Sequence, residues 1–187
     1  MAHKTISDEE MVTKALELFR AYGFDGVSLK QLADSMGLEK ASLYYRFPGG
    51  KDEIALTVVR AVDAMIREHV FKPLYATGTS PRRRVQLACE QLREFYAGGR
   101  KSCTLDVMSI RGASAEVREA LRGTVEAWID AFAAVAREGG LTAAHARTRA
   151  EEAIVRVEGA LVISRVLGET ASFERTLKQL PDLLTVA

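Results

Sequence analysis

The sequence predicts an all-α protein with a small three-helix domain in residues 1–50 and a larger helical domain in residues 51–187. Apolar residues recur at intervals of three and four along most of the chain, which is the spacing of helices with one buried face. Glycine and proline separate these periodic segments, and no segment alternates apolar and polar residues as a half-buried strand does. Together these observations favour a chain built from helices alone.

The composition is that of a globular protein, with 48% hydrophobic and 27% charged residues among 187. No run of about 18 apolar residues is present to cross a membrane. The N-terminal sequence MAHKTISDEEM lacks the apolar core of a secretory signal. We therefore expect no membrane partner and a cytoplasmic location. The two cysteines, Cys89 and Cys103, are too few for a disulfide scaffold.

The first helix is predicted to begin after Ser7. The Ser7 side chain can accept a hydrogen bond from a free amide of the first turn, while Glu10 can reach back to the Ser7 amide. Gly23 is expected to end this helix, because glycine readily takes the left-handed conformation found at helix ends. The predicted buried face carries apolar side chains at helical spacing: Val12, Ala15, Leu16 and Phe19.

Two short helices are predicted next. Ser28 and Gln31 have the spacing of a second capping box, which begins a helix of about two turns. Gly37 provides a tight turn, and a third helix is predicted from about residue 39 to 47 with Leu43 and Phe47 facing inward. Two short helices joined by a glycine turn and covered by a first helix are typical of a helix-turn-helix motif.

Pro48, Gly49 and Gly50 are expected to stop the third helix, and Lys51 opens a long fourth helix that is predicted to reach residue 69 or 71. Further helices are predicted at 81–96, 114–138, 142–167 and 172–184, with an ambiguous stretch at 102–112. Pro181 is expected to end the last helix near Leu180. The three arginines at 82–84 are expected to lie on a solvated face.

The third helix carries the chemistry that points to a function. In a helix-turn-helix motif the second of the two helices enters the major groove of DNA. There a tyrosine offers its hydroxyl to phosphates and base edges and its ring to thymine methyl groups, while arginine and lysine bind phosphates or guanine. Double-stranded DNA is therefore the predicted partner of five outward side chains: Lys40, Ser42, Tyr44, Tyr45 and Arg46.

A phosphate-binding site is predicted beside this helix. Gly49 and Gly50 are expected to expose backbone amides at the start of the fourth helix, where the helix dipole favours an anion and Lys51 adds a positive charge. Ser28 and Lys30, at the start of the second helix, are placed to hold the DNA backbone from the other side. Because the net charge is only +1, this anion-binding surface must be local.

The stretch VSLKQLADSMGLEKASLYYRFPGGKDEI resembles the DNA-binding domain of the tetracycline-repressor-like (TetR/AcrR) family of bacterial transcriptional regulators, and the resemblance covers about residues 7–56. The succession Leu-Tyr-Tyr-x-Phe-x-Gly-x-Lys carries it. This chain departs from the family pattern at Arg46, where histidine is more frequent, and at Glu39-Lys40, where a Ser or Thr cap is usual. The resemblance implies DNA contacts from Ser28, Lys30, Ser42, Tyr44, Tyr45, Arg46 and Lys51.

The resemblance also implies a larger domain that forms a homodimer and binds a small-molecule effector. In similar regulators the last two helices pair with their copies, and two apolar stripes fit that arrangement. A twofold dimer places two recognition helices one DNA turn apart, about 34–36 Å, and predicts a pseudo-palindromic operator. The stripes consist of Val155, Gly159, Val162, Ile163 and Val166 on one helix and of Phe173, Leu177, Leu180 and Leu184 on the next.

Candidate effector-binding residues come from two sources. The segments that enclose the ligand in similar regulators carry Met65, His69, Tyr96, Cys103 and Met108. The helix at 114–138 adds Trp128 and Phe132, whose apolar stripe is equally explained by core packing.

The leading hypothesis is a homodimeric transcriptional repressor, without a cofactor, that a small molecule releases from DNA. An alternative keeps the DNA-binding domain and makes the larger domain a redox sensor acting through Cys103 or Cys89. Arg100 and Lys101 precede Cys103 and favour its thiolate, which supports this alternative.

An enzyme is not predicted, because no Gly-rich phosphate loop or Ser/His/Asp arrangement is recognisable. A metal site is not predicted either. The three histidines, His3, His69 and His145, lack the spacing of metal ligands.

Overall fold

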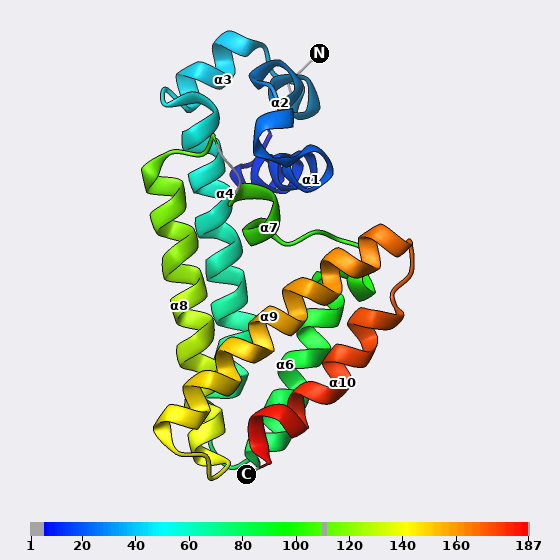
Figure 1. The fold of residues 1–187 in the computed structure, drawn as a ribbon. Coiled ribbons are helices and arrows are strands. Elements are labelled where there is room, and N and C mark those ends of the chain that lie inside the picture. The colour runs from blue at the N-terminus through cyan, green and yellow to red at the C-terminus, as the bar shows by residue number, and fades with distance from the viewer. Residues whose placement is uncertain (1–5, 110–111, 187) are drawn as a thin grey trace. The chain divides into compact units, whose positions relative to one another are not determined.

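The computed structural model describes residues 6–109 and 112–186, and every regular element in these ranges is a helix (Figure 1). The predicted all-α fold class is therefore confirmed. In the described ranges, no helix is long and apolar enough to cross a membrane. The helices group into two compact units, one of Met1–Val62 with Thr104–Leu121 and one of Asp63–Cys103 with Arg122–Ala187.

The first unit contains the three N-terminal helices, α1 (Asp8–Gly26), α2 (Leu29–Met36) and α3 (Lys40–Arg46). It also contains the start of α4 (Gly50–Ile66), the short α7 (Thr104–Met108) and the start of α8 (Ala115–Glu138). The described part of the stretch that the sequence left ambiguous, 102–112, thus contains one helix, α7, which packs on α1. The core draws a buried side chain from each of several helices: Phe19, Leu32, Leu43, Ile54 and Met108.

Gly23 kinks α1 and does not end it. The helix begins as predicted, with the Glu10 N–H donating to Ser7 Oγ at 3.1 Å. At Gly23 the backbone leaves the helical region, with φ 70° and ψ 171°, and the helix then resumes as far as Gly26. Phe24, directly after the kink, is buried and stacks on Phe19 with 6.0 Å between ring centroids. Burial of this ring favours the extra turn that the local sequence does not predict.

The second unit begins at the end of α4 and continues into a wide π-helical turn, η1 (Arg67–Phe71), and the short α5 (Lys72–Leu74). It further contains α6 (Pro81–Phe95), the 3₁₀ turn η2 (Ala97–Gly99), the larger part of α8, α9 (Ala143–Leu167) and α10 (Ala171–Thr185). α10 packs against both α6 and α9, as Figure 1 shows.

Pro181 lies inside α10, so the prediction that it ends the helix is wrong. The helix continues to Thr185. An interior proline costs a helix about 3 kcal/mol. Full burial of a leucine stabilises a fold by about 1.5–3 kcal/mol, and Leu180, Leu183 and Leu184 are all buried on this helix. Tertiary packing therefore outweighs the local preference.

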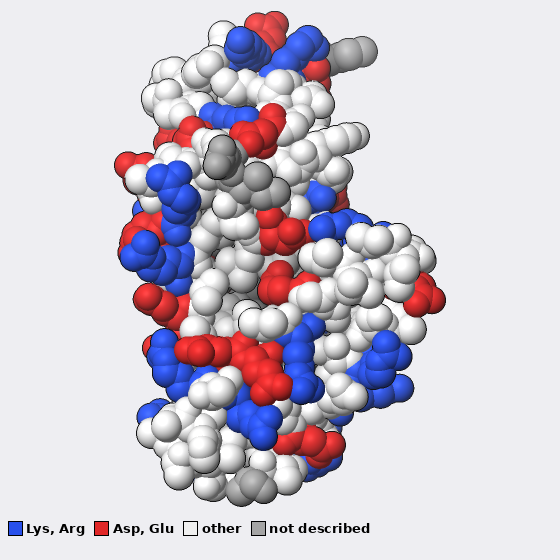
Figure 2. All heavy atoms as spheres, viewed as in Figure 1, with Lys and Arg blue, Asp and Glu red and all other residues white. Residues whose placement is uncertain are grey.

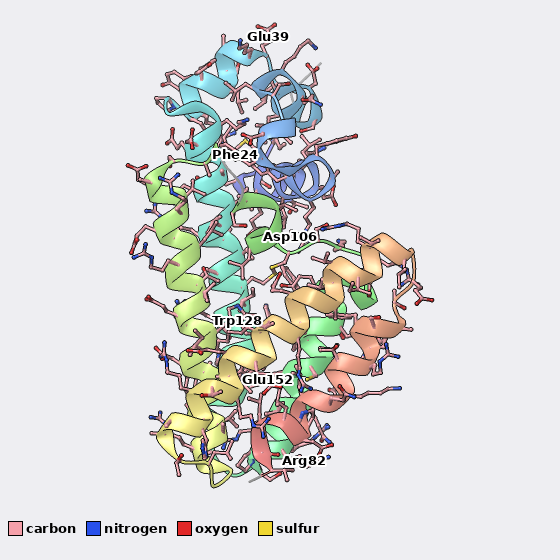
Figure 3. All side chains as sticks on the ribbon, in the orientation of Figure 1. Phe24, Glu39, Arg82, Asp106, Trp128 and Glu152 are labelled. Carbon is pink, nitrogen blue, oxygen red and sulfur yellow. The ribbon has the colours of Figure 1, made fainter. Side chains whose placement is uncertain are left out.

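Arg84 does not lie on a solvated face, in contrast to the prediction for residues 82–84. It is only 2% exposed. Its guanidinium donates to the Leu74 carbonyl at 2.7 Å and pairs with Glu138. The Leu74 carbonyl and the Glu138 carboxylate replace the water that the buried guanidinium has lost. Arg82, labelled in Figure 3, and Arg83 have half-exposed side chains, as predicted.

The two predicted C-terminal stripes differ in exposure. On α9, Val155 is 70% and Val166 72% exposed. On α10 the stripe belongs to the core of the protomer, so its assignment to a dimer surface is wrong. Its residues are between 0% and 1% exposed: Phe173, Leu177, Leu180 and Leu184.

Leu177→Ala is expected to lower the free energy of unfolding by about 2–5 kcal/mol, because it removes a fully buried side chain and leaves a cavity. The neighbouring Lys178→Ala, on the exposed side of α10, is the matched control and is expected to change stability by less than about 0.5 kcal/mol. Urea denaturation measures both. Equal small effects would show that the α10 stripe is not core.

Candidate nucleic-acid interface

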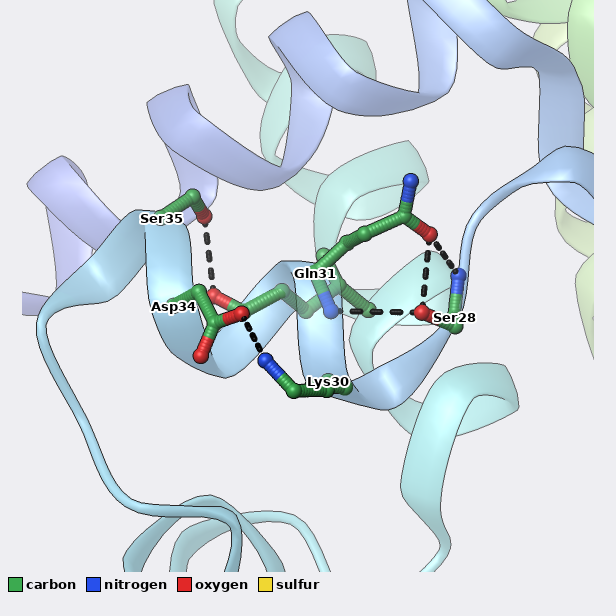
Figure 4. Close-up of polar contacts among 6 residues, drawn as sticks. Ser28, Lys30, Gln31, Asp34 and Ser35 are labelled. Carbon is green, nitrogen blue, oxygen red and sulfur yellow. Dashed lines mark hydrogen bonds and ion pairs between the residues drawn. The ribbon is translucent and has the colours of Figure 1, made fainter.

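The helix-turn-helix motif is organised by caps at both ends of α2. The Gln31 N–H donates to Ser28 Oγ at 3.2 Å and the Ser28 N–H donates to Gln31 Oε1 at 2.8 Å, so the predicted capping box is present (Figure 4). At the other end Gly37 is left-handed, with φ 67°. The Leu38 N–H there donates to the Ala33 carbonyl at 2.9 Å. Local sequence therefore fixes the turn that leads into α3.

α3 has one buried side chain, Leu43, and presents the others outward. Tyr45 is 91% exposed and Tyr44 43% exposed. Ser42 and Lys40 are also exposed, and the Lys40 ammonium lies 5.8 Å from the centre of the Tyr44 ring. This surface offers hydroxyl, ammonium and aromatic groups, which suit phosphates and base edges.

Ser28 and Lys30 are exposed but have partners within α2. The Ser28 hydroxyl donates to Gln31 Oε1 at 2.8 Å, and Lys30 Nζ lies 2.6 Å from Asp34 Oδ2 (Figure 4). The Lys30 and Asp34 side chains are 79% and 60% exposed, so their pairing is weak and screened by salt. A phosphate can therefore compete for Lys30.

Arg46 is exposed, and it also has partners within the domain. Its Nη2 lies 2.9 Å from Asp8 Oδ1, and its Nη1 donates to the Ile6 carbonyl at 3.3 Å. Met11 Sδ lies 3.6 Å from the same Nη1. The guanidinium thus joins the last turn of α3 to the start of α1. The only sequence signal was the acidic first turn of α1, which was interpreted as a cap.

Lys51 and the adjacent glycine amides also have partners within the domain. Lys51 Nζ donates to the carbonyl of Phe24, labelled in Figure 3, at 2.9 Å and lies 4.4 Å from the centre of its ring. The Gly49 N–H donates to Glu53 Oε2 at 2.8 Å, and the Gly50 N–H donates to a backbone carbonyl of the preceding turn at 2.9 Å. The expectation that these two amides are free is therefore wrong.

Charge on the visible surface is mixed. Figure 2 shows acidic and basic side chains interspersed, in line with the net charge of +1. A net charge of +1 leaves no large basic excess over the whole chain, so binding to DNA would depend on individual cations near α3.

A contact unforeseen from the sequence joins the start of α4 to the start of α8 within the first unit. Asp52 Oδ1 accepts the Ser114 N–H at 2.7 Å. Since 62 positions separate the two residues, no local pattern predicts the contact. Ser114 thus holds the side chain of Asp52, the residue that directly follows Lys51.

Two predicted effector-binding residues line a cavity of about 310 Å³ in the second unit. Met65 and His69 border it from the end of α4 and from η1. Such a volume holds a small organic molecule. The remaining lining comes from Ile66, Val70, Gln91, Glu94 and Phe95.

The other predicted effector residues do not line this cavity. Met108 is fully buried in the first unit. Trp128, labelled in Figure 3, and Phe132 are 7% and 1% exposed. Trp128 contacts Phe71 edge-on with 4.9 Å between ring centroids, and Phe132 lies 5.3 Å from Trp128. These aromatic residues are packed as core.

Both cysteines are buried, and they are not joined in a disulfide. Tyr96 Oη donates to Cys103 Sγ at 3.2 Å, and both residues are buried in the second unit. Burial raises the pKa of the Cys89 thiol to about 12, with Arg93 opposing and Glu90 adding to the effect. Since a thiol reacts as its thiolate, Cys89 is poorly suited to sensing oxidants.

Metal ligands are not gathered anywhere in residues 6–109 or 112–186. There no group of three or more His, Cys, Asp or Glu side chains is arranged to hold an ion. His3 lies outside the described residues.

Comparisons with known proteins agree with the helix-turn-helix geometry. The family model described as bacterial regulatory proteins, tetR family, matches residues 12–58. The model described as transcriptional regulator LmrA/YxaF-like, C-terminal domain, matches residues 81–179. Fold and motif together define a DNA-binding transcriptional regulator. The chain belongs to the TetR family, in its LmrA/YxaF-like branch.

Individual relatives match the chain over nearly its whole length. The HTH-type transcriptional regulator LmrA of Bacillus subtilis (strain 168) is 26% identical, covering 95% of this chain and 96% of its own. The uncharacterized regulator YxaF of the same organism is 23% identical over 98% of both. The crystal structure of a TetR transcriptional regulator from Legionella pneumophila has a TM-score of 0.86 at 18% identity, covering 98% of this chain and 100% of that one, which shows a shared fold.

Arg46→Gln and Asp8→Asn are each expected to weaken DNA binding by about two- to fivefold, because each removes the same contact between α3 and α1. The double variant is expected to bind no more weakly than either single variant. The salt dependence should not change, since no phosphate contact is lost. Fluorescence anisotropy over a series of KCl concentrations tests this. A slope reduced by about one in Arg46→Gln alone would assign Arg46 to a phosphate.

Cys89 is expected to resist alkylation by iodoacetamide at pH 7.5. With a pKa of about 12, against an ordinary 9.0, it carries about a thousandfold less thiolate than a free cysteine. Peptide mass spectrometry over time measures the rate, with urea-unfolded protein as the control. Equal rates in the folded and unfolded protein would contradict the raised pKa.

Proposed function

We propose that this chain acts as a homodimeric repressor that leaves a pseudo-palindromic operator when a small-molecule effector binds its second unit. The exposure of Tyr44 and Tyr45 on α3 is the observation that carries the proposal. Two aromatic side chains held in solvent on a short helix contribute little to packing of the protomer. They suit the major groove of DNA, where their rings and hydroxyls can meet base edges.

In this proposal the side chains around α3 have different roles. Tyr44, Tyr45 and Ser42 contact bases, while Lys30 and Lys40 contact phosphates. Ser28 and Lys51 reach the DNA backbone only by exchanging partners, which for Lys51 is the Phe24 carbonyl. Arg46 holds α3 in position from inside the domain.

The exposed stripe of α9 supports a homodimer. Val155, Ile163 and Val166 are 70%, 47% and 72% exposed, and Gly159 has open space around it. An apolar helix face of this kind favours a second helix laid against it. Twofold pairing of α9 with its copy covers the stripe on both chains and yields two recognition helices for one operator.

The cavity beside Met65 and His69 is the proposed effector site. It lies in the second unit, and α4 continues from there into the first unit, where Lys51 and Asp52 form its first turn. A ligand that prefers a wider spacing of the two recognition helices lowers DNA affinity by shifting the population of conformations, with α4 as the connection. The proposed location is the cytoplasm, because the operator DNA lies there.

The redox alternative has one supporting observation. The hydrogen bond from Tyr96 to Cys103 would stabilise a thiolate, although Cys103 is only 4% exposed. Peroxide treatment separates the two proposals. If peroxide abolishes DNA binding and this loss requires Cys103, the result favours a redox sensor. If peroxide does not change DNA binding, the result favours control by an effector bound in the cavity.

Tyr45→Ala is expected to lower affinity for the operator by about tenfold while affinity for random DNA stays within about twofold, because the lost contacts are with bases. Tyr22→Ala is the matched control, since Tyr22 is 60% exposed on α1. The operator is first selected from a random DNA library with the wild-type protein, and anisotropy then measures both affinities. The same loss on both DNAs, or in the control, would contradict base recognition by α3.

A further inference from the structure

A second open groove, with a volume of about 750 Å³, lies in the second unit beside the π-helical turn. Its lining differs from that of the proposed effector cavity and shares no residue with it. The groove is bordered by η1, α5 and α8, through Arg67, Phe71, Lys72, Tyr75, Ala127 and Asp130 among others.

The π-helical turn forms part of the lining of this groove. The Lys72 N–H donates to the Arg67 carbonyl five residues earlier, so the turn is wider than an α-helical one. Pro73 follows directly; it offers no N–H, and its ring would collide with the His69 carbonyl in a regular helix. π turns of this kind often occur at functional sites.

The Arg67 guanidinium is anchored through its Nε atom. Its Nε lies 2.6 Å from Asp63 Oδ2, and the Thr124 hydroxyl donates to Asp63 Oδ1 at 3.1 Å. Its two terminal amino groups form no hydrogen bond with the described residues, and Arg67 is part of the lining of the groove. A guanidinium fixed in this way is prepared to bind a carboxylate through both amino groups.

Asp130 and Tyr75 add polar groups to the lining of the groove. Among the described residues neither the Asp130 carboxylate nor the Tyr75 hydroxyl has a hydrogen-bond partner. Burial raises the pKa of Tyr75, the Asp130 carboxylate raises it further, and the Arg67 and Arg137 guanidinium groups oppose this rise. Arg67, Tyr75 and Asp130 all line the same groove.

Phe71 provides an apolar floor. It is 4% exposed and is held by the edge contact with Trp128 at 4.9 Å between ring centroids. The Arg67 guanidinium carbon lies 6.0 Å from the centre of the Phe71 ring. With the half-exposed Tyr75 ring, the groove combines an aromatic surface with one anion, Asp130, and two cations, Arg67 and Lys72, of which Lys72 pairs with Glu68.

We propose that this groove binds a small aromatic zwitterion, a molecule with a carboxylate for Arg67, an ammonium group for Asp130 and a ring for Phe71 and Tyr75. A simple anion lacks the ammonium group that Asp130 would bind, and a simple cation would meet repulsion from Arg67 and Lys72. The site is independent of the proposed effector cavity and of DNA binding.

Three probes test the proposal through the fluorescence of Trp128, the single tryptophan of the chain. L-phenylalanine carries both charges, 3-phenylpropionate only the carboxylate and phenethylamine only the ammonium group. In the full-length protein, excited at 295 nm, L-phenylalanine is expected to give a saturable change with an affinity at least about tenfold higher than that of either other probe.

Two variants test the charges of Arg67 and Asp130 one at a time. Arg67→Gln is expected to weaken L-phenylalanine binding about tenfold without weakening phenethylamine, and Asp130→Asn to weaken L-phenylalanine without weakening 3-phenylpropionate. Arg60→Gln, at an exposed position of α4, is the control. If Arg67→Gln does not fold, Asp130→Asn still tests whether the groove binds a zwitterion. No saturable response to L-phenylalanine, equal binding of 3-phenylpropionate, or indifference to Asp130→Asn would overturn the proposal.

Discussion

A helix of seven residues is not stable by itself in water, so α3 depends on the contacts that hold it. Three such contacts are present: the left-handed turn at Gly37, burial of Leu43, and the bonds of Arg46 to Asp8 and Ile6. They leave Tyr44 and Tyr45 outside. The orientation of the proposed DNA-reading surface is therefore set by packing inside the first unit, and α1 supports that surface as well as covering the core.

The parts of the fold that the sequence predicts well are those decided within a few positions. The capping box of Ser28 and Gln31 and the turn at Gly37 are of this kind, and both are present. The Arg46–Asp8 contact spans 38 positions and depends on how two helices cross, which no local pattern encodes. Pro181 shows the same limit, because the burial of neighbouring leucines outweighs a local helix breaker.

The candidate sites divide in a similar way. The exposed residues of α3 were predictable because a short amphipathic helix has one side left for solvent. The effector candidates came from resemblance and from an apolar stripe, and Met65 and His69 line the cavity of about 310 Å³. The groove beside η1 had one sequence signal, Pro73, whose effect on the helix is visible only in the structure.

Dimerisation through α9 is the claim on which the proposed repressor mechanism rests, and sedimentation equilibrium of Ile163→Arg tests it most directly. Wild-type protein and the exposed α10 variant Gln179→Arg are expected at twice the chain mass of 20.5 kDa. Ile163→Arg, which places a charge in the exposed stripe, is expected at the mass of one chain, with operator affinity lowered by about a hundredfold. A dimeric Ile163→Arg protein with unchanged operator affinity would contradict dimerisation through α9.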